Sequence, residues 1–97
     1  MYLEIVSPEA TLFSSEVDSV GVPGVSGAFQ MLKDHAPIVS LLGKGRVKIY
    51  MHNREMPDPD DVHERIVPDE DDKQILTLEI KSGTVEMQDN KVVVLAD

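Results

Sequence analysis

Short runs in which apolar and polar residues alternate dominate the chain. In residues 46–51 (RVKIYM) a large apolar side chain falls at every second position, and residues 75–81 (ILTLEIK) repeat the pattern. A period of two predicts strands with one buried face and one face in solvent. Other runs read as strand candidates in the same way are YLEIV, TLFS, EVDSVGV, AFQML, IVSLL, TVEMQ and KVVVLA.

Residues that favour turns separate these runs. Asp89 and Asn90, which both tolerate a positive φ, stand between TVEMQ and KVVVLA and predict a tight hairpin. Strands that recur roughly every 8 to 12 residues, with no sustained helical period, predict an all-β fold. We expect an antiparallel β-sandwich or flattened barrel of about 8 to 10 short strands. The run IVSLL is short enough to form a helical turn instead.

One segment interrupts this rhythm. Residues 53–74 (NREMPDPDDVHERIVPDEDDKQ) carry nine acids, three bases and three prolines but only four large apolar residues. Such a segment buries little apolar area against an ordering cost of roughly 1–2 kcal/mol per residue. We therefore expect an acidic, solvated and mobile loop between two strands, with room for one turn of helix near residues 60–66.

Length, charge and cysteine content narrow the class of protein. A chain of 97 residues is expected to form one domain, residues 1–97. Its formal charge of −9 argues against nucleic acid and anionic membrane as partners. The absence of cysteine excludes disulfides and thiolate metal sites. No apolar run approaches the roughly 20 residues that span a bilayer, and the first residues lack a signal-peptide pattern, so a soluble, cytoplasmic chain is expected.

Motifs that would carry chemistry are incomplete. The glycine spacing of residues 21–27 (GxxGxxG) differs from the dinucleotide-binding pattern, and Lys44 is not followed by the Ser or Thr of a phosphate-binding loop. His63 lacks a second histidine four positions on, and the acidic run 69–72 lacks the glycine of a calcium loop. These gaps predict no catalytic residue, no metal site and no cofactor.

Asp34, His35 and Ser40 have the residue types of a hydrolytic triad. Adjacent residues of an extended chain point to opposite faces, and no nucleophile turn such as GxSxG is present. We favour a structural role in which His35 hydrogen-bonds within its own turn. A small hydrolase that uses His35 remains an alternative, and so does a free-standing β-sandwich that binds a small ligand, although only four aromatic side chains exist to line a site.

Several motifs, taken in order, resemble a known family. The stretches VPGVSGAFQMLKDHAPIVSLLGKG and IKSGTVEMQDNKVVVLAD contain P-G-x-x-G, H-A-P, L-x-x-G and G-x-V-E-x-x-x-N-K-V-x-V-L-A-D. They resemble the N-terminal β-sandwich of the epsilon subunit of bacterial F-type ATP synthase. The resemblance implies a noncatalytic rotor subunit of the central stalk that binds the gamma subunit and the c-ring and acts on the catalytic alpha/beta head indirectly. It also implies a peripheral location on the cytoplasmic face of the bacterial cell membrane.

The resemblance also implies which residues meet these partners. It places the c-ring contacts at Ser26, Gly27, Ala28, Lys33, Asp34 and His35, and the gamma contacts at Ser7, Pro8, Val39 and Ser40. Ala28 stands where relatives commonly carry an acid, and Lys33 and Asp34 replace a usual Pro-Gly. The polar pairing with the ring is therefore expected to differ here, with Asp34 as the candidate for the missing charge.

Two further expectations concern the length of the chain and its surface. The resemblance implies that relatives usually continue beyond V-L-A-D into a helical hairpin that can inhibit ATP hydrolysis, so self-inhibition through this subunit is expected to be absent if the natural chain ends at Asp97. The acidic segment 53–74 is longer than the hairpin connection typical of relatives. Because residues 36–42 contain few polar side chains, we expect a contiguous exposed apolar patch there.

Overall fold

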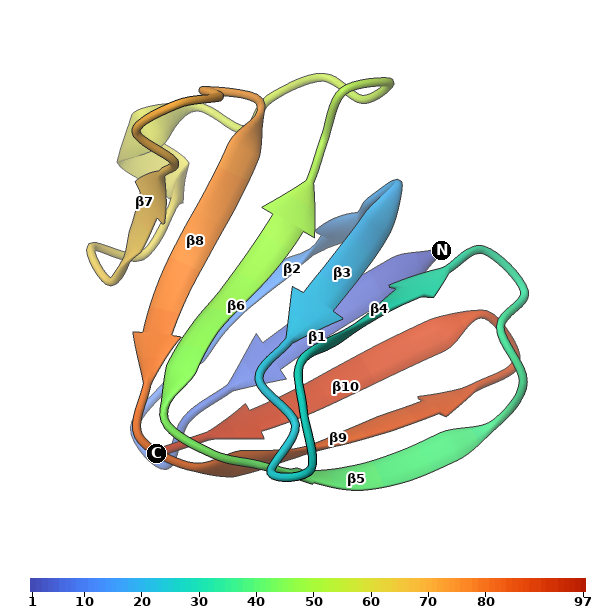
Figure 1. Ribbon diagram of the computed structural model, residues 1–97. Helices are drawn as coiled ribbons and strands as arrows, with labels where there is room; N and C mark the ends of the chain where they lie inside the picture. Colours follow the sequence, from blue (N-terminus) through green and yellow to red (C-terminus); the bar gives the residue numbers. More distant parts are fainter.

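Two five-stranded sheets pack face to face in the computed structural model, which describes residues 1–97 (Figure 1). Sheet one has the order β2 (Thr11–Glu16), β1 (Tyr2–Val6), β10 (Lys91–Ala96), β9 (Gly83–Gln88) and β5 (Ile38–Leu42). Sheet two has the order β4 (Phe29–Leu32), β3 (Ser19–Val22), β6 (Gly45–Tyr50), β8 (Ile75–Ile80) and β7 (Ile66–Pro68). The predicted β-sandwich is confirmed, and IVSLL forms strand β5 and not a helical turn.

Alternation decides which side chains reach the core. On β6, Val47 and Ile49 are fully buried while Arg46 and Lys48 are exposed. One exception is Thr77 on β8, which is buried at a position that alternation assigns to solvent. Its hydroxyl donates a hydrogen bond of 3.0 Å to the carbonyl oxygen of Val67, because β7 covers this edge of the sheet.

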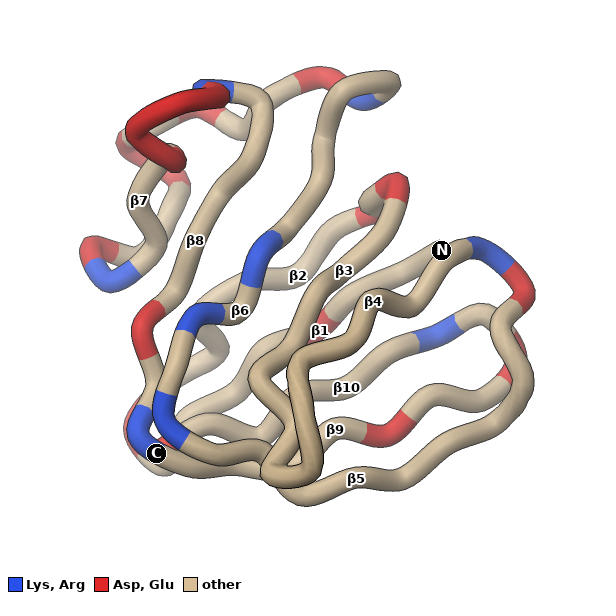
Figure 2. Tube along the Cα trace, viewed as in Figure 1, with Lys and Arg blue, Asp and Glu red and all other residues tan.

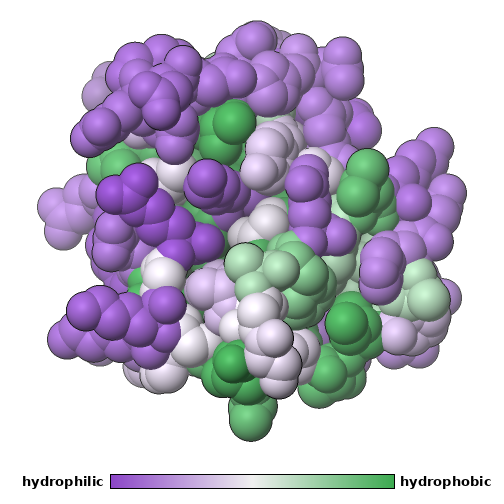
Figure 3. Space-filling view, in the orientation of Figure 1, coloured by the Kyte–Doolittle hydropathy of each residue, from purple (hydrophilic) through white to green (hydrophobic).

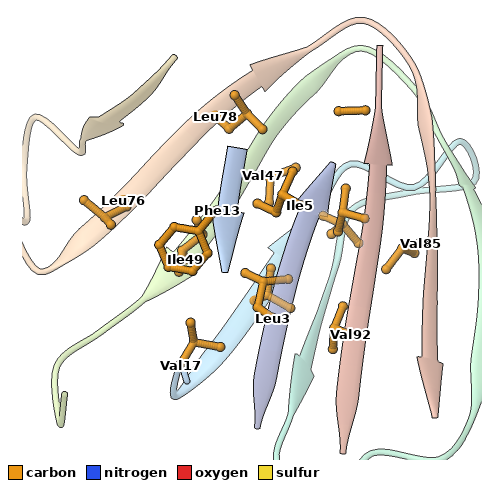
Figure 4. Close-up of a cluster of buried hydrophobic side chains, with 14 of the residues drawn as sticks. Leu3, Ile5, Phe13, Val17, Val47, Ile49, Leu76, Leu78, Val85 and Val92 are labelled. Atoms are coloured by element: carbon orange, nitrogen blue, oxygen red, sulfur yellow. The ribbon is translucent and has the colours of Figure 1, made fainter. Parts of the chain in front are cut away.

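The core is one cluster of 22 buried apolar residues between the sheets. Figure 4 shows Leu3, Ile5, Val85 and Val92 from sheet one packed among the side chains of sheet two. Burying a side chain of this size contributes about 1.5–3 kcal/mol. No helix is long and apolar enough to cross a membrane.

The β9–β10 hairpin has the predicted geometry. Asp89 and Asn90 have φ values of 53° and 61°, as a turn with two left-handed residues requires. The side-chain oxygen Oδ1 of Asn90 also accepts a 3.0 Å hydrogen bond from the backbone N–H of Asp34. The hairpin therefore fixes the turn between β4 and β5.

All strand pairs are antiparallel except one. β1 lies parallel to β10, with Leu3 opposite Val92 and Ile5 opposite Val94. The first and last strands are thus neighbours in the middle of sheet one (Figure 1). The sequence patterns did not predict this pairing.

The acidic segment 53–74 is more structured than predicted. It contains a single 3-10 turn, η1 (Pro59–Asp61), and strand β7, which pairs with β8. Ile66 is buried, and Met56 and Val62 pack against the core. Most residues of the segment are exposed, but Ile66 is buried because β7 pairs with the edge of β8. That pairing satisfies backbone groups of the segment and covers apolar area at the same time. The mobility of the segment stays a prediction.

Candidate interaction surface

The residues of the possible triad are not assembled into a catalytic group. His35 is exposed, and its Nδ1 donates a 2.7 Å hydrogen bond to the carbonyl oxygen of Ala36. The hydroxyl of Ser40 donates to the carbonyl oxygen of Leu41 on β5. No group of three or more His, Cys, Asp or Glu side chains is placed to hold a metal ion. The imidazole of His35 therefore hydrogen-bonds within its own turn, as the structural interpretation predicted.

A chain of apolar side chains crosses the outer surface of sheet one, on the side away from the core. We call it the outer apolar face; it comprises Val6, Val25, Val39, Leu41, Val93 and Leu95. The register aligns Leu41 with Thr84 and Leu95, so these positions are neighbours across β5, β9 and β10. Val25 reaches the same area from the β3–β4 turn, where it lines a shallow depression with Leu41 and Leu95. The depression measures about 490 Å³.

The side chains of the outer apolar face are well exposed. Val39 is 76% exposed, Leu41 and Val25 are each 62% exposed, and Leu95 is 52% exposed. Part of the face appears as hydrophobic residues along the lower edge of Figure 3, over β5 and the β3–β4 turn. Glu86 stands between Val39 and Val93 in the register, Glu4 lies opposite Val93 on β1, and Thr84 stands between Leu41 and Leu95. Residues 36–42 therefore contribute exposed Val39 and Leu41 to this face, and the contiguous patch expected there stays a prediction.

The outer surface of sheet two has the opposite character. Basic side chains of β6 and its preceding turn lie along it, whereas acids gather over the segment 53–74 (Figure 2). Arg46 Nε donates a 2.9 Å hydrogen bond to Glu79 Oε1, and this contact raises the pKa of the guanidinium above its usual range. The outer surface of sheet two thus carries bases along β6, whereas that of sheet one carries exposed valine and leucine side chains among polar residues such as Thr84 and Glu86.

The predicted c-ring residues fall into two separate groups. Ser26, Gly27 and Ala28 form the exposed β3–β4 turn, whereas Lys33, Asp34 and His35 form the β4–β5 turn. β4 runs between the two turns, so they lie at its opposite ends (Figure 1). The structure does not bring the two groups together.

The predicted gamma residues come from the β1–β2 turn and from β5, and they differ in exposure. Ser7 is buried, and its hydroxyl accepts from the backbone N–H of Ala10 and donates to the carbonyl oxygen of the same residue. Pro8 is exposed at the end of β1, and Val39 belongs to the outer apolar face. Ser40 is half-buried on the edge strand β5.

Sequence reasoning missed Val25 and Leu95 as surface candidates. Leu95 lies in KVVVLA, where apolar residues occupy both faces of one strand. Such an uninterrupted run is typical of strands that are covered on both sides. That run could have predicted a covered outer surface at Leu95. No sequence pattern predicted the position of Val25, because it belongs to a turn.

The β3–β4 turn is fastened to the outer apolar face by backbone hydrogen bonds. Val25 N–H donates to the carbonyl oxygen of Leu41 at 3.0 Å, and Gly43 N–H donates to that of Pro23 at 2.8 Å. A Cβ at Gly45 would lie 2.7 Å from the Cβ of Pro23, so the β5–β6 corner and this turn are in close contact. The turn and the face therefore form one connected unit.

Comparisons with known proteins agree on one family. A family model described as "ATP synthase, Delta/Epsilon chain, beta-sandwich domain" matches residues 1–58. The chain is 34% identical over 95 residues to the ATP synthase epsilon chain of Chlorobaculum tepidum, covering 98% of this chain and 86% of the relative. It is 32% identical over 95 residues to the epsilon chain of Leptospira interrogans, but there it spans 59% of the relative's length.

A solved structure supports the fold independently. The chain aligns with one in the central stalk and c-ring of the Tetrahymena thermophila mitochondrial ATP synthase with a TM-score of 0.68. The alignment covers 98% of this chain and 61% of the other, at 11% sequence identity. At that identity the match establishes the shared β-sandwich alone.

Proposed function

The chain belongs to the delta/epsilon β-sandwich family of ATP synthase subunits, and from this membership we propose that it couples the gamma subunit to the c-ring. It is a noncatalytic, structural subunit of the synthase complex. In the proposed arrangement it belongs to the central stalk, a placement that the Tetrahymena neighbour supports. The complex is membrane-associated, and we place this subunit on its cytoplasmic side, with the alpha/beta head affected only through gamma.

The outer apolar face is the observation that carries this proposal. Four of its side chains are half exposed or more, and covering each would contribute on the order of 1 kcal/mol. Monomeric proteins rarely expose contiguous apolar patches larger than a few hundred Å². We assign the face to gamma, whose matching surface would offer apolar side chains to Leu41 and Leu95 and a base to Glu86.

The predicted gamma residues fit this assignment to different degrees. Val39 and Pro8 are exposed and available for direct contact. Ser7 is buried in hydrogen bonds with Ala10, so it shapes the end of β1. Ser40 is half-buried and lies opposite the buried Val85, so its side chain is on the other face of β5 from Val39 and does not join a contact through the outer apolar face.

For the c-ring we favour the turn of Ser26, Gly27 and Ala28. Gly27 has a φ of 131° and open space around it, so this turn projects into solvent. The backbone N–H of Asp34 and the ring of His35 are already hydrogen-bonded within the molecule. Because the two turns lie at opposite ends of β4, a c-ring surface that contacts one turn would leave the other turn uncovered. The turn of Lys33, Asp34 and His35 is the alternative c-ring contact.

Coupling by this subunit is mechanical. Interdigitated side chains between the sheets pack at crystal-like density and deform little under load. The hydrogen bonds from Val25 to Leu41 and from Gly43 to Pro23 join the proposed ring contact to the proposed gamma contact. Torque applied at one would reach the other without passing through a flexible hinge.

Co-purification with gamma tests the proposal. Val39→Asp places a charge in the outer apolar face and is expected to abolish co-purification of this subunit with co-expressed gamma. Val67→Asp is the matched control, because Val67 is also an exposed valine on an edge strand, at 49% exposure, but lies on sheet two. Equal loss with both variants, or retention with both, contradicts the assignment.

Cross-linking tests the choice between the two turns. The chain contains no cysteine, so a single introduced cysteine provides its only thiol. In the assembled synthase with a cysteine in the polar loop of the c subunit, Ala28→Cys is expected to form a disulfide with c, and His35→Cys is not. The reverse pattern would transfer the ring contact to the β4–β5 turn.

A further inference from the structure

The segment 53–74 encloses a cleft against β8 that the stalk contacts do not use. Met56, Val62, Ile66 and Leu76 line it, and three prolines of the segment, at positions 57, 59 and 68, complete its walls. Its volume is about 670 Å³, within the range of roughly 300–1,000 Å³ typical of ligand sites. It lies at the β7–β8 edge of sheet two, the opposite edge from β4 and its turns.

The walls of the cleft are held in place before any ligand arrives. Asp58 caps the η1 turn by accepting a 3.0 Å hydrogen bond from the backbone N–H of Asp60, and the carbonyl oxygen of Asp58 accepts one of 2.8 Å from Asp61. Ile66 is anchored opposite Leu78 by strand pairing. The prolines restrict φ at three further positions. A preformed cleft loses less conformational entropy when it binds.

The rim of the cleft carries negative charge that the protein leaves unpaired. Glu55 and Asp58 line the cleft, and Asp60 and Asp61 follow on the η1 turn. None of these four acids forms a salt bridge, because the only ion pairs are those of Met1, Arg46, His52 and Arg54 with other acids.

Two of the three basic residues in the segment contact groups outside the cleft. Arg54 lies 3.4 Å from the carboxylate of Asp18. Arg65 donates to the carbonyl oxygens of Asp97 and Glu79, at 3.0 and 3.2 Å. Lys73 alone lines the cleft as a base. The lining of the cleft therefore combines apolar side chains with two acids and one base, and two further acids lie on the adjoining η1 turn.

We propose that this cleft binds a short basic amphipathic segment of a partner protein. One or two large apolar side chains of that segment would enter the space between Met56, Val62 and Leu76. Lysine or arginine residues on either side would pair with Glu55 and the acids of the η1 turn. The acid excess excludes phosphate-bearing partners, because their charge has the same sign as the rim. The site is separate from both proposed stalk contacts and does not depend on them.

Three synthetic peptides added to the 97-residue chain test the site. The first has leucines flanked by lysines, the second replaces the leucines with serine, and the third replaces the lysines with glutamate. Fluorescence anisotropy is expected to show the first binding at least about tenfold more tightly than either other, a difference of about 1.4 kcal/mol. Its binding should shift the methyl NMR signals of Met56, Val62, Ile66 and Leu76.

Matched charge reversals test the acidic rim. Glu55→Lys is expected to weaken the lysine–leucine peptide roughly fivefold or more, because it converts an attractive pair into a repulsive one. Glu64→Lys changes the same charge in the same segment but at an exposed residue that does not line the cleft, so it should weaken binding less than twofold. Val39→Asp should leave peptide binding unchanged, which separates this site from the gamma contact.

Four outcomes would overturn the proposal. These are equal binding of the lysine–serine peptide, methyl shifts located away from the cleft, equal effects of Glu55→Lys and Glu64→Lys, and no binding of the lysine–leucine peptide. The first and third would indicate attraction to the overall charge of the chain and not to the cleft.

Discussion

Truncation of Leu78 tests the packing of the two sheets directly. Leu78 has no exposed surface and lies between Val47 on β6 and Ile66 on β7 in the register of sheet two. Leu78→Ala removes buried methyl groups and leaves a cavity that flanking strands cannot easily close, which costs about 3–5 kcal/mol. A domain of this length has a free energy of unfolding of about 5–15 kcal/mol, so the variant should lose a large fraction of its stability.

Urea denaturation followed by far-UV circular dichroism measures this loss. If the free energy of unfolding falls by about 1.5 kcal/mol per molar urea, the urea concentration at the unfolding midpoint should fall by roughly 2–3 M while this slope is unchanged. Leu41→Ala is the matched control, since Leu41 is 62% exposed on the outer apolar face. Its cost in the isolated chain should stay below about 1 kcal/mol. Equal midpoint shifts for Leu78→Ala and Leu41→Ala would refute the inside and outside faces described for the sandwich.

Three other perturbations have defined outcomes. Gly83→Ala would place a Cβ 2.3 Å from the carbonyl oxygen of Leu95 within sheet one, so it should lower the free energy of unfolding by about 1–3 kcal/mol or more in the same urea assay; an unchanged midpoint would contradict this packing. The hydrogen bond from His52, followed by that from a backbone N–H, lowers the pKa of Asp72, so His52→Ala, which removes the ring donor, should raise that pKa in a carboxyl NMR titration. Because the pKa of Asp72 is lower in the folded protein, the Asp72 carboxylate stabilises the fold at a pH above its unfolded-state pKa of about 3.9, and this stabilisation is lost as the pH falls through the folded-state pKa. An Asp72 titration curve that is the same in the variant and the unmodified protein would exclude the contact. Asp89 has a positive φ of 53°, so Asp89→Val should cost about 1–2 kcal/mol by thermal or urea unfolding and Asp89→Gly much less, whereas equal effects would argue against the hairpin turn described.

The sandwich was predictable from sequence because its local signals agree with the fold. The alternation around Val47 and Leu78 assigns one face of each strand to the core, and both are fully buried. Asp89 and Asn90 specify their turn through backbone preferences that depend on no distant residue. Strands and turns that depend only on side-chain alternation and on local backbone preferences can therefore be predicted from the sequence.

The rest depends on contacts between distant segments. β7 has three residues, and its pairing with β8 is what buries Ile66 in a segment whose composition predicts solvent exposure. The outer apolar face forms because Leu41 and Leu95 come together across β9, which no local pattern encodes. The two turns at the ends of β4 are close in sequence, and only the direction of the strand between them reveals that they are apart.

The parallel pairing of β1 with β10 affects how the protein is made. β1 is the first strand of this domain to be translated, yet one of its two neighbours in sheet one is the domain's last strand. Contacts so remote in sequence form slowly because a long loop must close before they can stabilise anything. Until β10 arrives, the nascent domain holds β1 with one unpaired edge, and unpaired strand edges favour aggregation. Assembly into a larger complex must therefore wait until synthesis has passed β10.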